Sequence, residues 1–308
     1  MVRTEEGRGR ILVLGGGGML GHKVFQTLSR QFSDVWCTLR ASREDPPWNR
    51  IPLFMSGRIV NNVDALRLNA VDALLQDLRP SVIVNCIGAI KQRAAAADAE
   101  TSITLNSVLP HRIVRVAREW GGRLIHFSTD CVFSGRKGWY TETDEPDATD
   151  LYGRSKHLGE AAVGDVVTLR TSFIGRELQH HQSLLEWLLA QRHRKIRGFR
   201  RAWWSGLTSN HVAELVGELI RRHNTVSGLY NVSSGRISKY ELLLKLRDGL
   251  NLDVDIEPDD TLECDRSLSG QRFEEATGYR CPSWDALIRE LAQDPTPYET
   301  WVIKHGAS

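Results

Sequence analysis

A run of glycines directly behind a short apolar segment constrains the fold of this chain more than any other feature. Residues 10–14 read Arg-Ile-Leu-Val-Leu, and such a continuous apolar run is typical of a strand buried on both faces of a parallel sheet. Glycines follow at once, and apolar residues then recur at helical spacing from Leu20 to Phe32. The sequence therefore predicts a buried strand, a glycine turn and an amphipathic helix, in that order.

This turn favours a dinucleotide site. The glycines fit both G-x-x-G-x-x-G (15, 18, 21) and G-x-G-x-x-G (16, 18, 21), spacings that allow the backbone to approach a ligand closely. The helix N-terminus behind them offers free N–H groups and a positive dipole end to a pyrophosphate. The expected cofactor-binding residues here are Gly15, Gly18, Met19, Leu20 and Gly21. The alternative is a flexible glycine-rich turn that binds nothing.

The second predicted strand, residues 35–40, ends in a basic residue. An acidic residue at this place would accept hydrogen bonds from the ribose 2′-hydroxyl of NAD, whereas Arg40 and Arg43 suit a 2′-phosphate. We therefore expect NADPH rather than NADH, unless these arginines are only solvated loop residues. Asp64, ahead of an amphipathic helix expected over 68–79, is a further cofactor-binding candidate, and a short strand is expected over 51–55.

Another buried strand is expected over residues 81–88. It ends in Cys86, Ile87 and Gly88, and these small residues would let a cofactor ribose lie against the backbone.

A further strand, over residues 122–128, ends in hydroxyl and carboxylate groups. Ligands bind at the carboxyl ends of strands in open α/β sheets, so Thr129 is a candidate hydrogen-bond partner for a substrate carbonyl. Asp130 is a candidate substrate contact at the same place. The alternative is that both residues only form an Asx or ST turn, which is common at strand ends.

Tyr152 and Lys156 lie four residues apart, so a helix would place both side chains on one face. An ammonium group beside a phenol favours the phenolate and lowers the pKa of the phenol, which gives a proton donor and acceptor usable near neutral pH. Such a pair also occurs by chance on ordinary surface helices. The pair indicates a catalytic site only together with a cofactor site and a third catalytic group, for which Thr129 is the candidate.

Composition limits the classes of function. A chain of 308 residues has room for one large α/β domain or two smaller ones, and its net charge of +2 implies no general attraction to nucleic acid or to anionic membranes. Five cysteines show no metal spacing, and the histidines offer no third ligand, so no metal is expected. The N-terminus lacks the apolar core of a signal peptide, and no apolar run reaches transmembrane length, so we expect a cytoplasmic protein.

Basic and aromatic residues alternate over residues 192–204. Such a segment suits a nucleotide diphosphate with a stacked base, and Arg201 and Trp204 are its candidate substrate-binding residues. It would also suit nucleic acid, or form only a solvated face. The low net charge favours the nucleotide sugar. Further along, Ser238 and Glu241 predict a capping box, and the acidic stretch 253–265 is expected to be a loop.

Taken together, the motifs resemble one known family. They are the glycine turn, the strand end 85–88, Ser-Thr-Asp-Cys-Val-Phe-Ser-Gly at 128–135, Tyr-Thr-Glu at 140–142 and Tyr-Gly-Arg-Ser-Lys at 152–156. In this order they resemble the extended short-chain dehydrogenase/reductases, most closely the dTDP-4-dehydrorhamnose reductase branch. The likeness is specific over about residues 10–175 and looser beyond them.

The resemblance implies a role for each matching residue. Thr129 would hold the substrate carbonyl, Tyr152 would protonate its oxygen as hydride arrives, and Lys156 would bind the nicotinamide ribose and lower the pKa of Tyr152. Two departures from the family pattern point to a different sugar. Cys131 stands where that branch usually has tyrosine, and the substrate-facing loop 89–93, with the substrate-binding candidate Lys91, differs from the usual one.

We therefore expect an α/β fold, a Rossmann-type doubly wound parallel sheet with a smaller α-rich C-terminal lobe. The NADP-binding domain would comprise residues 1–172 and a strand near 228–235, and the substrate-binding lobe residues 173–227 and 236–308. The expected function is NADPH-dependent reduction of a 4-keto-(6-deoxy) nucleotide sugar by a possible homodimer. Two alternatives remain: an epimerase or dehydratase that retains its NAD(P), and a regulatory subunit that binds NADP without catalysis.

Overall fold

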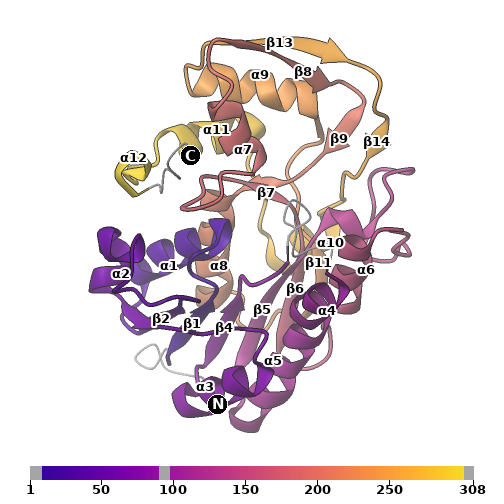
Figure 1. Ribbon diagram of the computed structural model, residues 1–308. Helices are drawn as coiled ribbons and strands as arrows, with labels where there is room; N and C mark the ends of the chain where they lie inside the picture. Colours follow the sequence, from indigo (N-terminus) through magenta and orange to yellow (C-terminus); the bar gives the residue numbers. More distant parts are fainter. Residues whose placement is uncertain (1–8, 90–97, 302–308) are drawn as a thin grey trace.

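A seven-stranded parallel sheet forms the centre of the molecule (Figure 1), a computed structural model that describes residues 9–89 and 98–301. Its strands lie in the order β11-β6-β5-β4-β1-β2-β3. They are β1 (Ile11–Leu14), β2 (Val35–Thr38), β3 (Arg58–Val60), β4 (Val82–Asn85), β5 (Arg123–Ser128), β6 (Val166–Arg170) and β11 (Gly228–Asn231). The order reverses between β1 and β4, and ligands of open α/β sheets bind at such a switch point.

Helices cover both faces of this sheet (Figure 1), which confirms the doubly wound Rossmann-type fold. The helices α1 (Met19–Gln31) and α8 (Ser209–Arg221) pack side by side on one face. The other face carries α3 (Leu68–Leu78) and α5 (Leu109–Ala117), with α4 (Ala99–Ile103) and α6 (Leu151–Leu158) beside them. The predicted domain division placed α8 in the substrate lobe. In the structure its apolar face packs along α1, and the domain division stays a prediction.

The prediction of a strand over residues 51–55 is wrong, because this segment forms the helix α2 (Pro52–Ser56). Proline is favoured at the first position of a helix, and the turn buries Phe54 against Phe25 and Trp48. β2 pairs with β1 on one side and with β3, directly after this helix, on the other.

The C-terminal lobe lies above the sheet in Figure 1 and combines helices with small sheets. Its helices are α7 (Leu184–Leu189), α9 (Lys239–Gly249), α11 (Trp284–Ala292) and α12 (Tyr298–Trp301). Its strands are β8 (Arg194–Phe199) with β13 (Val254–Asp259), and β9 (Ala202–Trp204) between β12 (Ile237–Ser238) and β14 (Cys264–Asp265). A short pair, β7 (Phe173–Ile174) and β10 (Leu207–Thr208), joins the lobe to the sheet, and α10 (Gln271–Thr277) packs on β11.

The acidic stretch 253–265 is not a loop, as was expected, but contains β13 and β14. β13 pairs with β8 in parallel, with Asp255 opposite Lys195. Lys195 forms an ion pair with Glu257, and Arg200 forms one with Asp260. Part of the basic segment is therefore neutralised by the acidic one.

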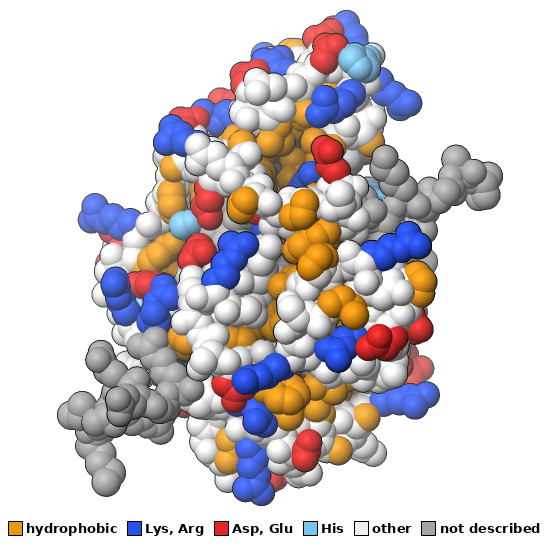
Figure 2. Space-filling view, turned by 90° about the vertical axis from the view of Figure 1, so that its left-hand side faces the viewer, with side chains coloured by type: hydrophobic (Ala, Val, Ile, Leu, Met, Phe, Trp, Pro, Cys, Tyr) orange, Lys and Arg blue, Asp and Glu red, His pale blue; other side chains and the backbone are white. Residues whose placement is uncertain are grey.

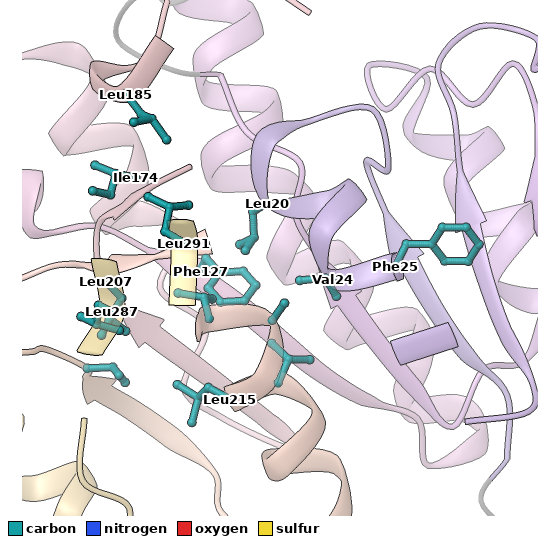
Figure 3. Close-up of a cluster of buried hydrophobic side chains, with 14 of the residues drawn as sticks. Leu20, Val24, Phe25, Phe127, Ile174, Leu185, Leu207, Leu215, Leu287 and Leu291 are labelled. Carbon is teal, nitrogen blue, oxygen red and sulfur yellow. The ribbon is translucent and has the colours of Figure 1, made fainter. Parts of the chain in front are cut away.

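One hydrophobic core extends from the sheet into the lobe. Figure 3 shows Leu20 and Val24 of α1 close to Phe127 at the end of β5, with residues of the lobe on their other side. The lobe residues of this cluster include Ile174, Leu185, Leu207, Leu287 and Leu291. The lobe therefore shares the core of the Rossmann domain.

Among the described residues, no helix combines the length and the apolar character that crossing a membrane requires.

Candidate active site

A cavity of about 600 Å³ lies between the carboxyl ends of the sheet strands and the lobe. The sheet side consists of residues that follow β4, β5 and β6, and the lobe side comes from α7, β8, β9 and α9. Aromatic side chains of the lobe line it, namely Trp187, Phe199, Trp203 and Trp204. Figure 2 shows hydrophobic side chains gathered in a hollow below the top of the molecule.

The glycine turn has the geometry of an anion-binding helix start. Gly15 has a φ of +85°, a conformation that favours glycine, and its N–H donates to Thr38 Oγ1 over 3.0 Å. A Cβ on Gly21 would lie 2.1 Å from the carbonyl oxygen of Gly15, so only glycine permits this packing. Gly18 is the N-cap of α1, and no side chain caps the helix there. The start of α1 is therefore open to a pyrophosphate, which fits a dinucleotide cofactor.

The predicted cofactor residues fall into two groups. The cavity is lined by Met19, Leu20, Cys86, Ile87 and Gly88. A second group, Arg40, Arg43 and Asp64, lies outside the cavity lining, near the end of β2. Arg40 is exposed, Arg43 pairs with Glu44 at 3.2 Å, and Asp64 Oδ1 accepts the N–H of Leu66. The 2′-phosphate site at Arg40 and Arg43 stays a prediction.

The helix α6 carries Tyr152 and Lys156 into the cavity. It begins where Asp150 accepts the N–H of Gly153 at 2.8 Å, which is a stabilising N-cap. Thr129 follows β5 and lines the same cavity. The structure thus brings together the three candidate catalytic residues from two distant segments.

Thr129 also forms the turn that was its alternative interpretation. Its Oγ1 accepts the N–H of Cys131 at 3.1 Å and donates to Asp130 Oδ1 at 3.1 Å. Asp130 accepts a further hydrogen bond from Ser172 Oγ. The ST turn and the site are therefore compatible, because the turn holds the hydroxyl of Thr129 beside Tyr152.

Burial is the largest cause of the pKa shifts of Tyr152 and Lys156. Burial raises the pKa of Tyr152 well above its usual value and Cys131 raises it further, whereas the Thr129 hydroxyl lowers it. Burial lowers the pKa of Lys156 to about 8, and Glu160 opposes that change. Lys156 Nζ donates to the carbonyl oxygen of Phe127 at 2.6 Å. The predicted lowering of the Tyr152 pKa is therefore not found, because loss of solvation outweighs the nearby ammonium group.

The substrate-binding candidates are not all brought together. Asp130 and Trp204 line the cavity. Arg201 does not line it, because its exposed side chain forms an ion pair with Glu263. Lys91 lies outside the described residues.

Two cations in the cavity wall were missed by the sequence. Lys239 Nζ lies 4.0 Å from the ring centroid of Trp204, and burial lowers its pKa to about 8 while Asp130 raises it. Arg266 Nε donates to the carbonyl oxygen of Phe133 at 2.9 Å.

The predicted capping box is confirmed, since the Ser238 hydroxyl and Glu241 side chain cap α9, but it indicated nothing about the neighbouring Lys239.

Asn106 was also missed as a site residue. It lies in a π-helical turn, Thr104–Val108, and is fully buried. Its Nδ2 donates to Ser155 Oγ at 3.0 Å, and its Oδ1 accepts the N–H of Ala89 at 2.9 Å. Asn106 thereby ties the end of β4 to α6. The available sequence signal was weak, because π-helical turns at functional sites have no reliable sequence pattern.

The sequence is similar to that of a known family and of several curated proteins. A family model, the RmlD substrate binding domain, matches residues 9–294. The methionine adenosyltransferase 2 subunit beta of Danio rerio is 31% identical over 156 residues, 50% of this chain and 43% of that protein. A probable low-salt glycan biosynthesis reductase of Haloferax volcanii is 32% identical over 167 residues, 53% of this chain and 52% of that protein. The chain thus spans about half the length of these two curated relatives.

A solved structure extends the likeness to the whole fold. The dTDP-4-dehydrorhamnose reductase of Bacillus anthracis, in complex with NADP, matches with a TM-score of 0.76 and 19% identity. The match covers 92% of this chain and 99% of that chain. The chain belongs to the RmlD substrate binding domain family.

Proposed function

We propose that this protein is an NADPH-dependent reductase of a 4-keto-(6-deoxy) nucleotide sugar. The observation that carries this proposal is that Thr129, Tyr152 and Lys156 line one cavity, which also reaches the first residues of α1. A carbonyl beside the hydroxyls of Thr129 and Tyr152 would face both a hydrogen-bond donor and a proton donor. The raised pKa of Tyr152 keeps the phenol protonated near neutral pH, which is the state that a reduction needs.

The cofactor would lie along the switch point of the sheet. Bound NADPH supplies the hydride for the carbonyl carbon. The open start of α1 would hold the pyrophosphate, Arg40 and Arg43 the 2′-phosphate, and Lys156 the nicotinamide ribose. The solved B. anthracis relative in complex with NADP supports this choice of cofactor.

The lobe side of the cavity suits a nucleotide diphosphate. Its cations, Arg197, Lys239 and Arg266, would face the phosphates, and its tryptophans offer faces for the base or the sugar. Reductase names among the curated relatives and solved structures support a nucleotide-sugar substrate. Enclosure between sheet and lobe would exclude water and orient the carbonyl.

The test begins with binding of NADPH and NADH to the purified protein, followed by NADPH absorbance with a panel of 4-keto sugar nucleotides. Replacing Tyr152 with phenylalanine should lower turnover by about 10²–10⁴-fold and leave NADPH affinity unchanged, because only the proton donor is lost. Tyr240→Phe is the matched control, since Tyr240 does not line the cavity. Near-normal turnover of Tyr152→Phe would rule out the assigned role.

A second candidate function is that of an NADP-binding subunit without catalysis. The match to a subunit of methionine adenosyltransferase 2 favours it. Tight NADPH binding with no consumption across the panel would support this candidate, or an epimerase or dehydratase that retains its cofactor. Stoichiometric NADPH oxidation would exclude both. The homodimer stays a prediction.

A further inference from the structure

We propose that Glu160 is a positioning residue that joins the three segments of the candidate active site and keeps Lys156 in its charged form. This inference rests on the proposed function. Glu160 follows α6, and its side chain is only 4% exposed. Both carboxylate oxygens are used: Oε1 accepts from Ser128 Oγ and Arg170 Nε, each at 2.7 Å, and Oε2 accepts from Arg170 Nη2 at 2.7 Å.

Each partner of Glu160 adjoins a residue of the site. Ser128 ends β5 and directly precedes Thr129. Arg170 ends β6, two residues before Ser172, whose hydroxyl donates to Asp130. Glu160 itself lies one helical turn beyond Lys156. One buried carboxylate therefore fixes the relative positions of the strand ends and of the helix that carries Tyr152.

The Arg170 side chain is held as firmly as Glu160. It is 2% exposed, and its guanidinium carbon lies 5.1 Å from the ring centroid of Phe133. A bidentate pair of this kind fixes orientation as well as charge. Buried pairs of this kind are weak evidence for stability, since desolvation offsets the attraction. A role in orientation explains the arrangement better.

Besides burial, the charge of Glu160 acts on the protonation of Lys156. Glu160 raises the pKa of Lys156, which burial alone would lower further. His126, on β5, is kept neutral because burial and Lys156 lower its pKa well below its usual value. Tyr152 is also neutral near pH 8, because burial raises its pKa. His157, which is half exposed, contacts Glu160 Oε2 at 3.0 Å on the side toward solvent.

Two opposite substitutions separate a role in charge from a role in folding. Glu160→Gln leaves the Arg170 cation uncompensated, so Lys156 should lose its proton at a pH about one unit lower. Arg170→Gln leaves the carboxylate uncompensated, so Lys156 should stay charged to a higher pH. The double variant Glu160→Gln, Arg170→Gln restores the charge balance and should titrate near the wild-type value. A purely structural role would not shift the titration in opposite directions.

The titration of Lys156 is followed by NMR in protein with ¹³C-labelled lysine, with Lys156→Met to assign the signal, and it needs neither cofactor nor substrate. NADPH oxidation with the active member of the panel gives the second readout. The alkaline limb of its pH profile should move with the Lys156 signal, and Glu160→Gln should lose about fivefold in turnover at pH 8. If no panel member is reduced, the proposed function fails, while the NMR result still decides the role of Glu160. Unchanged titration in both single variants would overturn the proposal.

Ser128→Ala covers the case in which a single charge variant does not fold. It removes one hydrogen bond from Glu160 and alters no charge. We expect an unchanged Lys156 titration and a several-fold loss of turnover, because Thr129 is held less firmly. Wild-type turnover of this variant would overturn the positioning role.

Discussion

At the scale of the residue, Lys239 is the cavity cation that we most expect to bind an anionic group of a ligand. Its Nζ lies 4.0 Å from the ring centroid of Trp204, and the charge of Asp130 raises its pKa. Burial has lowered its pKa to about 8, so an ammonium group and a neutral amine coexist near physiological pH. An anionic group of a substrate would favour the ammonium form and raise that pKa.

Binding of a nucleotide sugar should therefore weaken as the pH rises through 8. With dTDP-glucose and UDP-glucose as probes, the affinity of the wild type should be up to about tenfold lower at pH 9 than at pH 7. Lys239→Met should bind weakly at both values, because no titrating cation remains. Calorimetry with NADP present measures both effects.

Lys245→Met is the control for this prediction, since Lys245 lies on the same helix but pairs with Asp285 at the surface. It should retain the affinity and the pH dependence of the wild type. Equal affinity of Lys239→Met and wild type at pH 7 would mean that Lys239 does not contact the substrate.

The sequence predicted those site residues that lie in compact motifs. Tyr152 and Lys156 share one short helix, and Gly15 and Gly21 share one turn, so spacing alone indicated their geometry. Lys239 could not be predicted in this way, because only tertiary folding brings it to the cavity. The sign of the Tyr152 shift failed for the same reason: burial is a property of the folded chain and not of a motif.

At the scale of the element, the start of α1 depends on the close approach of two glycines. The Gly15 carbonyl lies where a side chain at position 21 would begin, so the turn and the first helical turn interlock. Gly18 N–H donates to the same carbonyl at 3.1 Å. This packing aims the uncapped N-terminus of the helix at the switch point of the sheet.

Gly21→Ala should therefore damage both stability and cofactor binding. The added Cβ would be 2.1 Å from a backbone oxygen that cannot move aside freely, so we expect a loss of about 1–3 kcal/mol in unfolding free energy. NADPH affinity should fall at least tenfold, since the N–H groups of the helix start are displaced. Urea unfolding and fluorescence titration measure the two effects.

Gly235→Ala is the matched control, because a Cβ there meets no atom within 4 Å. It should behave as the wild type. A stable Gly21→Ala protein with normal NADPH affinity would contradict the proposed place of the pyrophosphate.

The pair β8 and β13 shows which elements the sequence does not predict. Ile196 and Ile256 face one another in the register and are buried, while basic and acidic residues occupy the exposed positions. Each strand alone reads as a charged segment, because only half of its residues face the core. The pairing joins residues about 60 positions apart, and a local pattern carries no information about such a contact.

At the scale of the whole molecule, the shared core makes the lobe and the sheet one folding unit. Leu20 of α1 and Leu291 of α11 belong to one buried cluster (Figure 3). Local periodicity predicted the helices on either side, but which helix packs on which layer follows from long-range contacts. The packing of α8 beside α1 is one such long-range contact.

The C-terminal segment closes this unit by returning to α1. Lys23 Nζ donates to Asp294 at 2.6 Å, in an ion pair whose side chains are only 4% and 7% exposed, and also to Thr296 at 3.0 Å. Next to it, His22 Nε2 and the Tyr298 hydroxyl are 2.8 Å apart. The chain end is thus attached to the first turns of the helix that begins at the glycine turn.

Asp294→Asn should destabilise the protein by about 3–5 kcal/mol at pH 7, because it leaves the buried Lys23 without its counter-ion. Burial already lowers the pKa of Lys23 and Asp294 opposes that change, so the variant should hold a still lower pKa. The unfolded chain then binds more protons than the folded one, and stability rises with pH. Part of the loss should therefore return by pH 9.5 in urea unfolding.

Asp285→Asn, which breaks an exposed pair with Lys245, should cost less than about 1 kcal/mol at either pH. Equal effects of the two substitutions would mean that the C-terminal segment does not secure α1.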